Sequence, residues 1–192
     1  MVQYTKRAIE DTFLRMVTEQ SLDRITVKDL VTECGVNRNT FYYHYTDIYD
    51  LIEKTFLREK DRVLGQDYTN VSYRDALEEV IDLLLNNRQA IGNIYFSKGK
   101  EIIERYLKEL GDEFCGGYIR ARAAGRKIDD QILYLVTACY SEAFRGIMER
   151  WLAEYDGMKK DGFVEALSRL TESTVDIALN EMEKLGQEMG IV

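Results

Sequence analysis

The chain of 192 residues contains no proline, although average usage of about 5% would supply roughly ten. Because proline and clusters of turn residues interrupt helices, their scarcity favours long uninterrupted helices. No sustained alternation of β-branched residues, which would indicate half-buried strands, runs through the chain. These absences predict an all-α fold.

Cysteine is also scarce, since Cys34, Cys115 and Cys139 stand alone and form no CxxC pair. An odd number of isolated cysteines favours reduced thiols in a cytoplasmic protein over a disulfide framework. No apolar run approaches the roughly eighteen residues of a membrane span, and the N-terminus lacks the pattern of a signal peptide. We therefore expect a soluble cytoplasmic protein without a membrane segment.

The sequence offers little chemistry for catalysis. With a single histidine, His44, no Ser/His/Asp or Cys/His arrangement stands out. The segment SKGK at 97–100 lacks the GxxxxGK[ST] spacing of a phosphate-binding loop. No metal-ligand cluster appears, and the paired acids Asp129 and Asp130 are more simply charges at the start of a helix. We expect neither enzymatic activity nor a bound cofactor or metal.

The chain is acidic, with 26 Lys and Arg against 34 Asp and Glu and a net charge of −8. This excess argues against indiscriminate nucleic-acid binding, because non-specific affinity comes mostly from cations that meet phosphates. The charge is uneven: residues 1–60 carry a net −1 and residues 61–192 carry −7. A nearly neutral N-terminal part is compatible with a local DNA-binding face.

Residues 26–45 have the pattern of two short helices joined by a tight turn. Thr26 is a suitable N-cap, and apolar residues follow it at helical spacing. Gly35 supplies the left-handed backbone that ends the first helix, and Asn37 can cap a second helix over 38–45. The pattern predicts a helix-turn-helix, although spacing alone leaves other helical hairpins open.

The side chains of the second helix divide by their reach. Arg38 and Asn39 lie near its start and suit hydrogen bonds to guanine and adenine edges, and Thr40 can offer a methyl group or hydroxyl to a base. Phe41 and Tyr45 are predicted to face the core. Tyr42, Tyr43 and His44 carry hydrogen-bond donors that suit phosphate oxygens. Such contacts position a protein on DNA but do not read the base sequence.

The residues ITVKDLVTECGVNRNTFYYHY, followed by TDIYDLI, resemble the DNA-binding signature of the TetR/AcrR family of transcriptional regulators. The resemblance implies a helix-turn-helix DNA-binding domain and a helical ligand-binding and dimerisation domain. One position departs, because Ile48 stands where the family often has a lysine that anchors a phosphate. DNA contacts are expected at Thr26, Lys28, Asn37, Arg38, Asn39, Thr40, Tyr42, Tyr43 and His44.

We predict a DNA-binding domain over 1–46, a linking helix over 47–65, and a ligand-binding and dimerisation domain over 66–192. A polar segment at 65–70 marks the last boundary. The first helix is expected over 5–19. Lys6 and Arg7 lie in its first turn, where they either meet a DNA backbone or remain solvated.

The two C-terminal helices are predicted over about 129–155 and 162–185, with a loop at 157–162 between them. Apolar residues of the first cover more than one stripe, so this helix needs neighbours on two sides. Two long antiparallel apolar helices suit a homodimer in which they form a four-helix bundle with their copies.

The preferred hypothesis is a dimeric transcriptional regulator, usually a repressor in this family, that binds a pseudo-palindromic operator in double-stranded DNA. An unidentified small-molecule effector would release it by favouring one of two states. The alternative is a helical adaptor whose DNA-binding head has degenerated. Seven aromatic residues either line an effector pocket or belong to the ordinary hydrophobic core: Tyr95, Phe96, Tyr106, Phe114, Tyr118, Tyr140 and Phe144.

Overall fold

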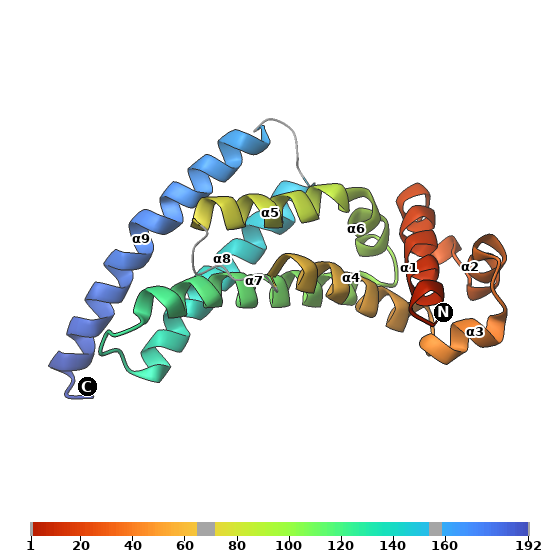
Figure 1. Cartoon of the computed structure of the whole chain (residues 1–192). Coiled ribbons are helices and arrows are strands. Elements are labelled where there is room, and N and C mark those ends of the chain that lie inside the picture. Colours follow the sequence, from red (N-terminus) through yellow and green to blue (C-terminus); the bar gives the residue numbers. More distant parts are fainter. Residues whose placement is uncertain (1, 65–71, 154–158, 192) are drawn as a thin grey trace. The chain divides into compact units, whose positions relative to one another are not determined.

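The computed structural model describes residues 2–64, 72–153 and 159–191, and the regular structure in these ranges is helical throughout (Figure 1). The predicted all-α fold is therefore confirmed for this part of the chain. None of the helices described has the length and hydropathy needed to cross a membrane. Their bounds are α1 Val2–Glu19, α2 Val27–Cys34, α3 Arg38–His44, α4 Ile48–Leu64, α5 Tyr73–Asn86, α6 Arg88–Tyr95, α7 Lys100–Ala123, α8 Asp130–Ala153 and α9 Lys160–Glu188, with a 3₁₀ turn at Leu22–Arg24.

Contacts within the chain define two compact units. Unit 1 contains residues 1–63 and 83–106, and unit 2 contains residues 64–82 and 107–192. Helices α1 to α3, α4 up to residue 63, and α6 belong to unit 1, whereas α8 and α9 belong to unit 2. The domain division predicted from the sequence stays a prediction, and its boundary segment at 65–70 lies outside the described residues.

The core of unit 1 is formed by one face of α1 and the helices packed against it. Ile9, Phe13 and Val17 recur every four residues on α1 and have no exposed surface. Leu22 and Ile25, in the connection to α2, are 3% and 5% exposed and lie in the same core. The apolar face of α1 therefore becomes the support for the helix pair that follows it.

Helix α1 begins at Val2, so its predicted start at Thr5 is wrong. The residues before Thr5 include no glycine or proline that would stop a helix, and the helix extends past Thr5 toward the N-terminus. Lys6 and Arg7 consequently lie beyond the first turn. The Lys6 ammonium lies 4.0 Å from the Glu10 carboxylate one turn further on, whereas Arg7 is exposed.

The C-terminal end of α1 is held by α6. The last carbonyl groups of a helix have no partner within the helix. The Asn93 side-chain amide supplies one, since it donates to the carbonyl oxygens of Val17 at 2.8 Å and Thr18 at 3.1 Å. The Asp23 carboxylate accepts from the Lys98 backbone N–H at 3.3 Å. These bonds fix the end of α1 against the turn between α6 and α7.

In unit 2, α7 and α8 approach each other closely at Gly111. A Cβ atom at this position would lie 3.1 Å from the Ser141 carbonyl oxygen and 3.4 Å from Cδ1 of Phe144. The buried Ser141 hydroxyl donates to the Gly111 carbonyl oxygen at 3.3 Å. The absent side chain is thus what allows the two backbones to meet.

Replacing Gly111 by valine is expected to destabilise the protein by about 1–3 kcal/mol, because the added isopropyl group must displace the α8 backbone. The matched control is Gly117→Val on the same helix, where nothing lies within 4 Å of a Cβ atom. The control should stay within about 0.5 kcal/mol of the parent. Urea unfolding followed by circular dichroism measures the free energy of unfolding of both variants. Equal changes in this free energy would show that α8 can move away from position 111 at little cost.

Helix α9 begins at Lys160, so the predicted loop at 157–162 is wrong from residue 160 onward, while residues 157 and 158 lie outside the described ranges. The reason is tertiary: the Lys160 ammonium pairs with Asp82 at 2.7 Å and with Glu78 at 3.0 Å, both on α5. Those contacts anchor the first turn of α9 within unit 2. The preceding helix, α8, starts at Asp130, close to its predicted start.

The C-terminal end of α7 is joined to α9 by charged side chains. Arg122 and Arg126 both pair with Asp176, Arg126 at 3.2 Å, and Arg126 also donates to the Asn180 side chain. The hydrogen bond from Arg122 holds the pKa of Asp176 below its ordinary value. Exposed pairs of this kind are each worth only about 0–1 kcal/mol, so they set the register of the helices more than their stability.

Candidate DNA-binding surface

The first helix of the predicted helix-turn-helix is fixed at its N-terminus by a capping box. The Thr26 hydroxyl accepts from the Asp29 backbone N–H at 3.2 Å, and the Asp29 carboxylate accepts from the Thr26 backbone N–H at 3.2 Å. The same carboxylate accepts from the Thr26 hydroxyl at 2.6 Å, and this bond lowers the pKa of Asp29. Two otherwise unpaired N–H groups are thereby satisfied.

The turn between α2 and α3 depends on Gly35, which has a φ of 69°. This left-handed conformation is open to glycine at little cost. The Val36 N–H donates to the Val31 carbonyl oxygen at 3.0 Å, which closes the end of α2. The chain then enters α3 at once, with the Asn37 side chain accepting from the Asn39 N–H at 2.8 Å. The predicted roles of Thr26, Gly35 and Asn37 in the backbone are confirmed.

Helix α3 has one buried side chain, Phe41, which has no exposed surface. The other faces carry polar side chains and tyrosines, and Tyr42 and Tyr43 are 46% and 75% exposed. Arg38 donates to the Tyr42 hydroxyl at 3.2 Å, and its guanidinium lies 5.5 Å from the centre of that ring. This pairing, one helical turn apart, orients the Arg38 side chain along the exposed side of α3.

The residues predicted to contact DNA belong to the start of α2, the start of α3 and the length of α3. Two of them, Thr26 and Asn37, already use a side-chain oxygen to cap their helices. His44 is half-buried and its ring lies edge-on to Tyr43 at 5.0 Å. Seven of the nine are exposed, whereas Thr40 and His44 are half-buried; the exposed ones are Thr26, Lys28, Asn37, Arg38, Asn39, Tyr42 and Tyr43.

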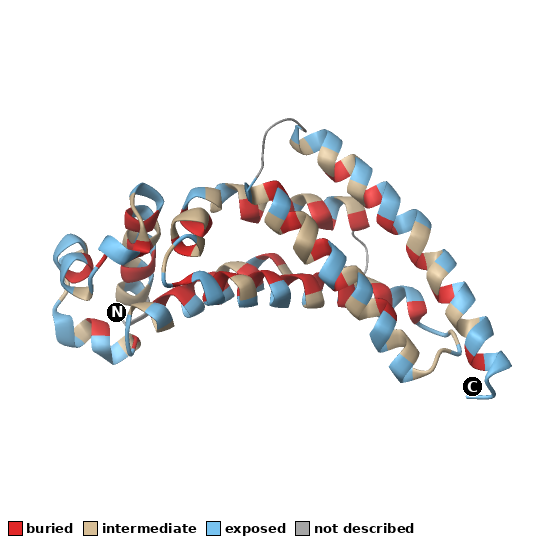
Figure 2. Cartoon of the chain, turned by 180° about the vertical axis from the view of Figure 1, so that it is seen from behind, coloured by how far each residue is buried: buried red, intermediate tan, exposed pale blue. Residues whose placement is uncertain are grey.

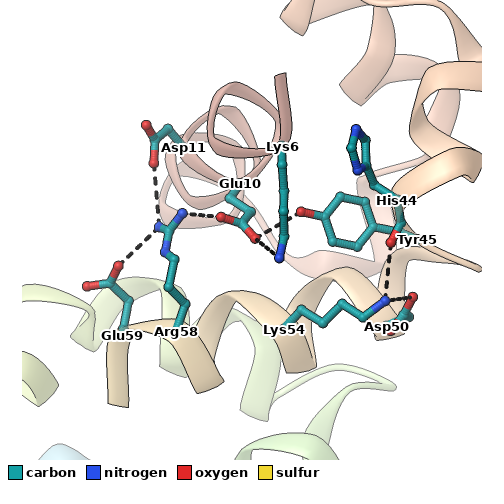
Figure 3. Close-up of polar contacts among 9 residues, drawn as sticks. All are labelled: Lys6, Glu10, Asp11, His44, Tyr45, Asp50, Lys54, Arg58 and Glu59. Carbon is teal, nitrogen blue, oxygen red and sulfur yellow. Dashed lines mark hydrogen bonds and ion pairs between the residues drawn. The ribbon is translucent and has the colours of Figure 1, made fainter. Parts of the chain in front are cut away.

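The first residue of α4 is Ile48, and its N-terminus is capped by Asp47, whose carboxylate accepts from the N–H groups of Tyr49 at 2.8 Å and Asp50 at 2.9 Å. Ile48 takes the place of the lysine expected from the family, but Lys54, almost two turns further along α4, contacts the end of α3. The Lys54 ammonium donates to the His44 carbonyl oxygen at 3.2 Å and to Asp50 at 2.9 Å (Figure 3).

Unit 2 contains a cavity of about 200 Å³ bordered by α5, α7, α8 and α9. Among the described residues that line it, none has a charged side chain. Hydroxyl groups line it in two pairs: Tyr140 donates to Thr174 at 3.0 Å, and the buried Tyr73 hydroxyl lies 3.5 Å from that of Thr171. The described residues that line it are Tyr73, Cys115, Tyr140, Ala143, Phe144, Ile147, Leu167, Leu170, Thr171 and Thr174.

The aromatic residues predicted for an effector pocket are divided between the two units. Tyr140 and Phe144 line the cavity. Phe114 stacks on the lining residue Tyr73 with ring centres 5.2 Å apart, and the Tyr118 ring is tilted against Tyr73 at 4.5 Å. The structure places the other three in unit 1, where they line no part of this cavity: Tyr95, Phe96 and Tyr106. Tyr106 packs on Phe56 at 5.0 Å and is buried, whereas Phe96 is 79% exposed.

Helices α8 and α9 keep an apolar surface exposed. On α9, Leu170 and Ile177 are 58% and 62% exposed and lie seven residues apart, which places them on one face two turns from each other. On α8, Tyr134 and Leu135 are 71% and 61% exposed. In Figure 2 the buried residues of α9 recur along one side, with exposed residues between them. The described part of unit 2 therefore leaves both helices incompletely covered.

Comparison with known families identifies both parts of the chain. Residues 11–55 match the sequence model of the bacterial regulatory proteins of the tetR family, and residues 72–173 match that of a transcriptional regulator C-terminal region of the same family. The chain belongs to the TetR family. This TetR-family protein is thus a DNA-binding transcriptional regulator, and the resemblance predicted from residues 25–52 is confirmed.

Solved structures agree with this TetR-family fold. The dihydroxyacetone kinase operon activator DhaS is 14% identical and has a TM-score of 0.68, with 93% of this chain and 96% of that chain covered. A TetR-family regulator from Rhodococcus sp. is 17% identical with a TM-score of 0.52 (94% and 99% covered). The TetR family repressor AlkX from Dietzia sp. strain DQ12-45-1b is 13% identical with a TM-score of 0.53 (91% and 96% covered). No curated protein sequence matches this TetR-family chain.

Two features of the TetR-family chain did not emerge from its sequence. The cavity uses Tyr73 together with Thr171 and Thr174, which lie about a hundred positions further along the chain, and no local pattern marks them. The buried Glu10 was also missed. A carboxylate on the apolar face of a predicted amphipathic helix, between Ile9 and Phe13, is the signal that would have pointed to it.

Proposed function

We propose that this TetR-family regulator acts as a homodimeric repressor that binds a pseudo-palindromic operator and is released by a small uncharged effector. The observation that carries the DNA-binding part is the surface of α3. Its single buried residue, Phe41, holds it in the core, while Arg38, Asn39 and Tyr42 extend outward from a helix capped at its start. Arginine and asparagine near the start of such a helix are suited to guanine and adenine edges in the major groove.

Selection of bound sequences from a random duplex pool at near-physiological salt tests this proposal. A dimer places two recognition helices about one DNA turn apart, roughly 34–36 Å, so the selected sequence should have two-fold symmetry. The salt concentration must be stated, because phosphate contacts make affinity steeply salt-dependent. No enrichment from a folded dimer would favour the adaptor hypothesis instead.

The sign of regulation needs a separate measurement, since one similar protein is named an activator and another a repressor. A promoter fused to a reporter and carrying the selected operator should be less active when the regulator is present. Repression is the expected result, because a dimer bound across a promoter excludes other proteins from it. Higher activity in the presence of the regulator would instead identify an activator.

The cavity in unit 2 supports the effector part of the proposal. Its wall is apolar apart from hydroxyl groups and the Cys115 thiol, whose pKa burial raises to about 12, so that the thiol stays neutral. A charged ligand would lose its hydration here without a partner of opposite charge. About 200 Å³ is small beside ordinary ligand pockets of roughly 300–1,000 Å³. We therefore propose a small neutral ligand with one hydrogen-bonding group.

Phenol and benzoate form a matched pair of probes for the cavity. Phenol is expected to raise the unfolding temperature at millimolar concentration, and benzoate is not, because its carboxylate finds no cation in the cavity wall. Thr174→Val should weaken phenol binding about fivefold by removing a hydroxyl, which is worth about 1 kcal/mol in a typical hydrogen bond. Ser173→Val, on the exposed side of α9, is the control. Equal binding of benzoate would contradict a neutral site.

A further inference from the structure

A carboxylate is buried at the junction of three helices of unit 1. Glu10, on α1, is 1% exposed, and its side chain points toward the end of α3 and toward α4 (Figure 3). An isolated carboxylate in such a place would be strongly unfavourable, so its partners matter. Its two oxygen atoms are engaged by different helices.

One carboxylate oxygen of Glu10 accepts a hydrogen bond from Tyr45, at the end of the predicted recognition helix α3. Oε1 accepts a hydrogen bond from the Tyr45 hydroxyl at 2.9 Å, and Tyr45 is 1% exposed. Burial, together with the bond to Glu10, raises the pKa of Tyr45, so this hydroxyl stays protonated and continues to donate. Tyr45 is the residue at which α3 ends, since its backbone N–H donates to the Phe41 carbonyl oxygen at 2.9 Å.

The other carboxylate oxygen of Glu10 is paired with Arg58 of α4. Oε2 accepts from the Arg58 guanidinium, which also lies 3.1 Å from Glu59 and 3.6 Å from Asp11. The Lys6 ammonium is 4.0 Å from Oε1. Glu10 therefore joins α1 to the end of α3 through Tyr45 and to α4 through Arg58.

A second link between α3 and α4 lies beside the first. The Lys54 ammonium donates to the His44 carbonyl oxygen at 3.2 Å, which satisfies one of the free carbonyl groups at the end of α3. The same ammonium lies 5.4 Å from the centre of the Tyr45 ring and is paired with Asp50 at 2.9 Å. The end of α3 is thus tied to both of the helices that support it.

Helix α3 has little else to hold its direction. It is seven residues long, two turns, and such a short helix does not persist without tertiary contacts. Phe41 is its one buried side chain and the Tyr45 ring is buried beside its end, but apolar packing of two rings is not directional. Base recognition needs the contacting groups fixed to within about 0.5 Å. The bond at the far end of α3 supplies a second fixed point.

We infer that Glu10 is a positioning residue for operator recognition: through Tyr45 it fixes the recognition helix against α1 and α4. This inference rests on the proposed function. The group does not touch DNA, and it acts on Arg38 and Asn39 only by holding α3. A hydrogen bond to a buried charged group is directional and worth about 1.5–3 kcal/mol, so its loss is expected to loosen the direction of α3 and to reduce sequence discrimination.

The test compares Tyr45→Phe, which deletes one hydroxyl, with Tyr49→Phe, the same deletion at a 39% exposed tyrosine of α4. The full chain is titrated against the selected operator duplex and against a scrambled duplex of equal length, at several salt concentrations. Tyr45→Phe is expected to weaken operator binding about tenfold and scrambled binding less than twofold. The salt dependence should not change, because no phosphate contact is lost. Tyr49→Phe should behave as the parent.

A second variant, Glu10→Gln, keeps an oxygen for the Tyr45 hydroxyl and removes the charge that Arg58 meets. Both single variants and the double variant Glu10→Gln/Tyr45→Phe form a cycle. Losses smaller than additive are expected, because the two changes disrupt one network. Circular dichroism at the assay temperature establishes that each variant is folded before its affinity is compared.

The outcomes separate the inference from the proposed function. If the parent protein selects no operator, the proposed function fails. If the parent prefers its operator and Tyr45→Phe keeps the same ratio of operator to scrambled affinity, the positioning role of Glu10 is overturned. Parallel losses on both duplexes, in step with a lower unfolding temperature, would also overturn it, because they would reflect stability alone.

Discussion

Arg38→Ala is expected to weaken operator binding at least about thirtyfold, because a bidentate contact to guanine is worth about 1–3 kcal/mol and a dimer makes it twice. The structure supports this size of effect because Arg38 is exposed near the start of α3 and is oriented by its contacts with Tyr42. Affinity for a scrambled duplex should fall far less, since that term depends on phosphate contacts. Fluorescence anisotropy with both duplexes at one stated salt concentration measures the difference.

The control for lost charge is Arg15→Ala. Arg15 is also an exposed arginine of unit 1, and its partner is Glu33 at 2.6 Å. An exposed pair contributes about 0–1 kcal/mol to stability, and Arg15 lies outside the predicted contact surface, so operator affinity should change less than threefold. Equal losses by Arg38→Ala on the operator and the scrambled duplex would mean that Arg38 meets only phosphates. Specificity would then have to come from Asn39, Thr40 or the shape of the DNA.

The helix-turn-helix could be predicted from the sequence because its boundaries depend on short-range bonds. Thr26, Gly35, Asn37 and Asp47 each act on backbone groups within about five positions along the chain. Rules for caps and turns describe interactions of this range. The two helix starts that were mispredicted, at α1 and α9, lacked such a signal.

The cavity and the Glu10 junction could not be predicted because they depend on distant partners. Glu10 meets Tyr45 and Arg58, which lie 35 and 48 positions away in the sequence. The start of α9 is likewise decided by Lys160 and its partners on α5. The local sequence, with glycines at 157 and 162 on either side of Lys160, predicts a loop, whereas the tertiary pairing keeps Lys160 in a helix.

Ile177→Arg is expected to convert the proposed dimer into a monomer and to abolish measurable operator binding at nanomolar protein concentration. Ile177 is 62% exposed on α9, on the same face as Leu170 at 58%. In an isologous interface each substitution appears twice near the two-fold axis, so two cations would lose hydration close to each other. A monomer contacts one half-site only, and its affinity lacks the contribution of the second. Sedimentation velocity and anisotropy measure the two effects.

The matched control is Glu172→Arg, which adds a cation at an exposed polar position of α9, about 200° around the helix from Leu170. It should remain dimeric and bind the operator at least as well as the parent, since it also makes the acidic chain less negative by two charges. A stable interface needs roughly 1,000 Å² of buried surface, which α8 and α9 together must supply. Dimerisation of Ile177→Arg with parental affinity would place the interface elsewhere, and the exposed apolar residues of α9 would then require another partner.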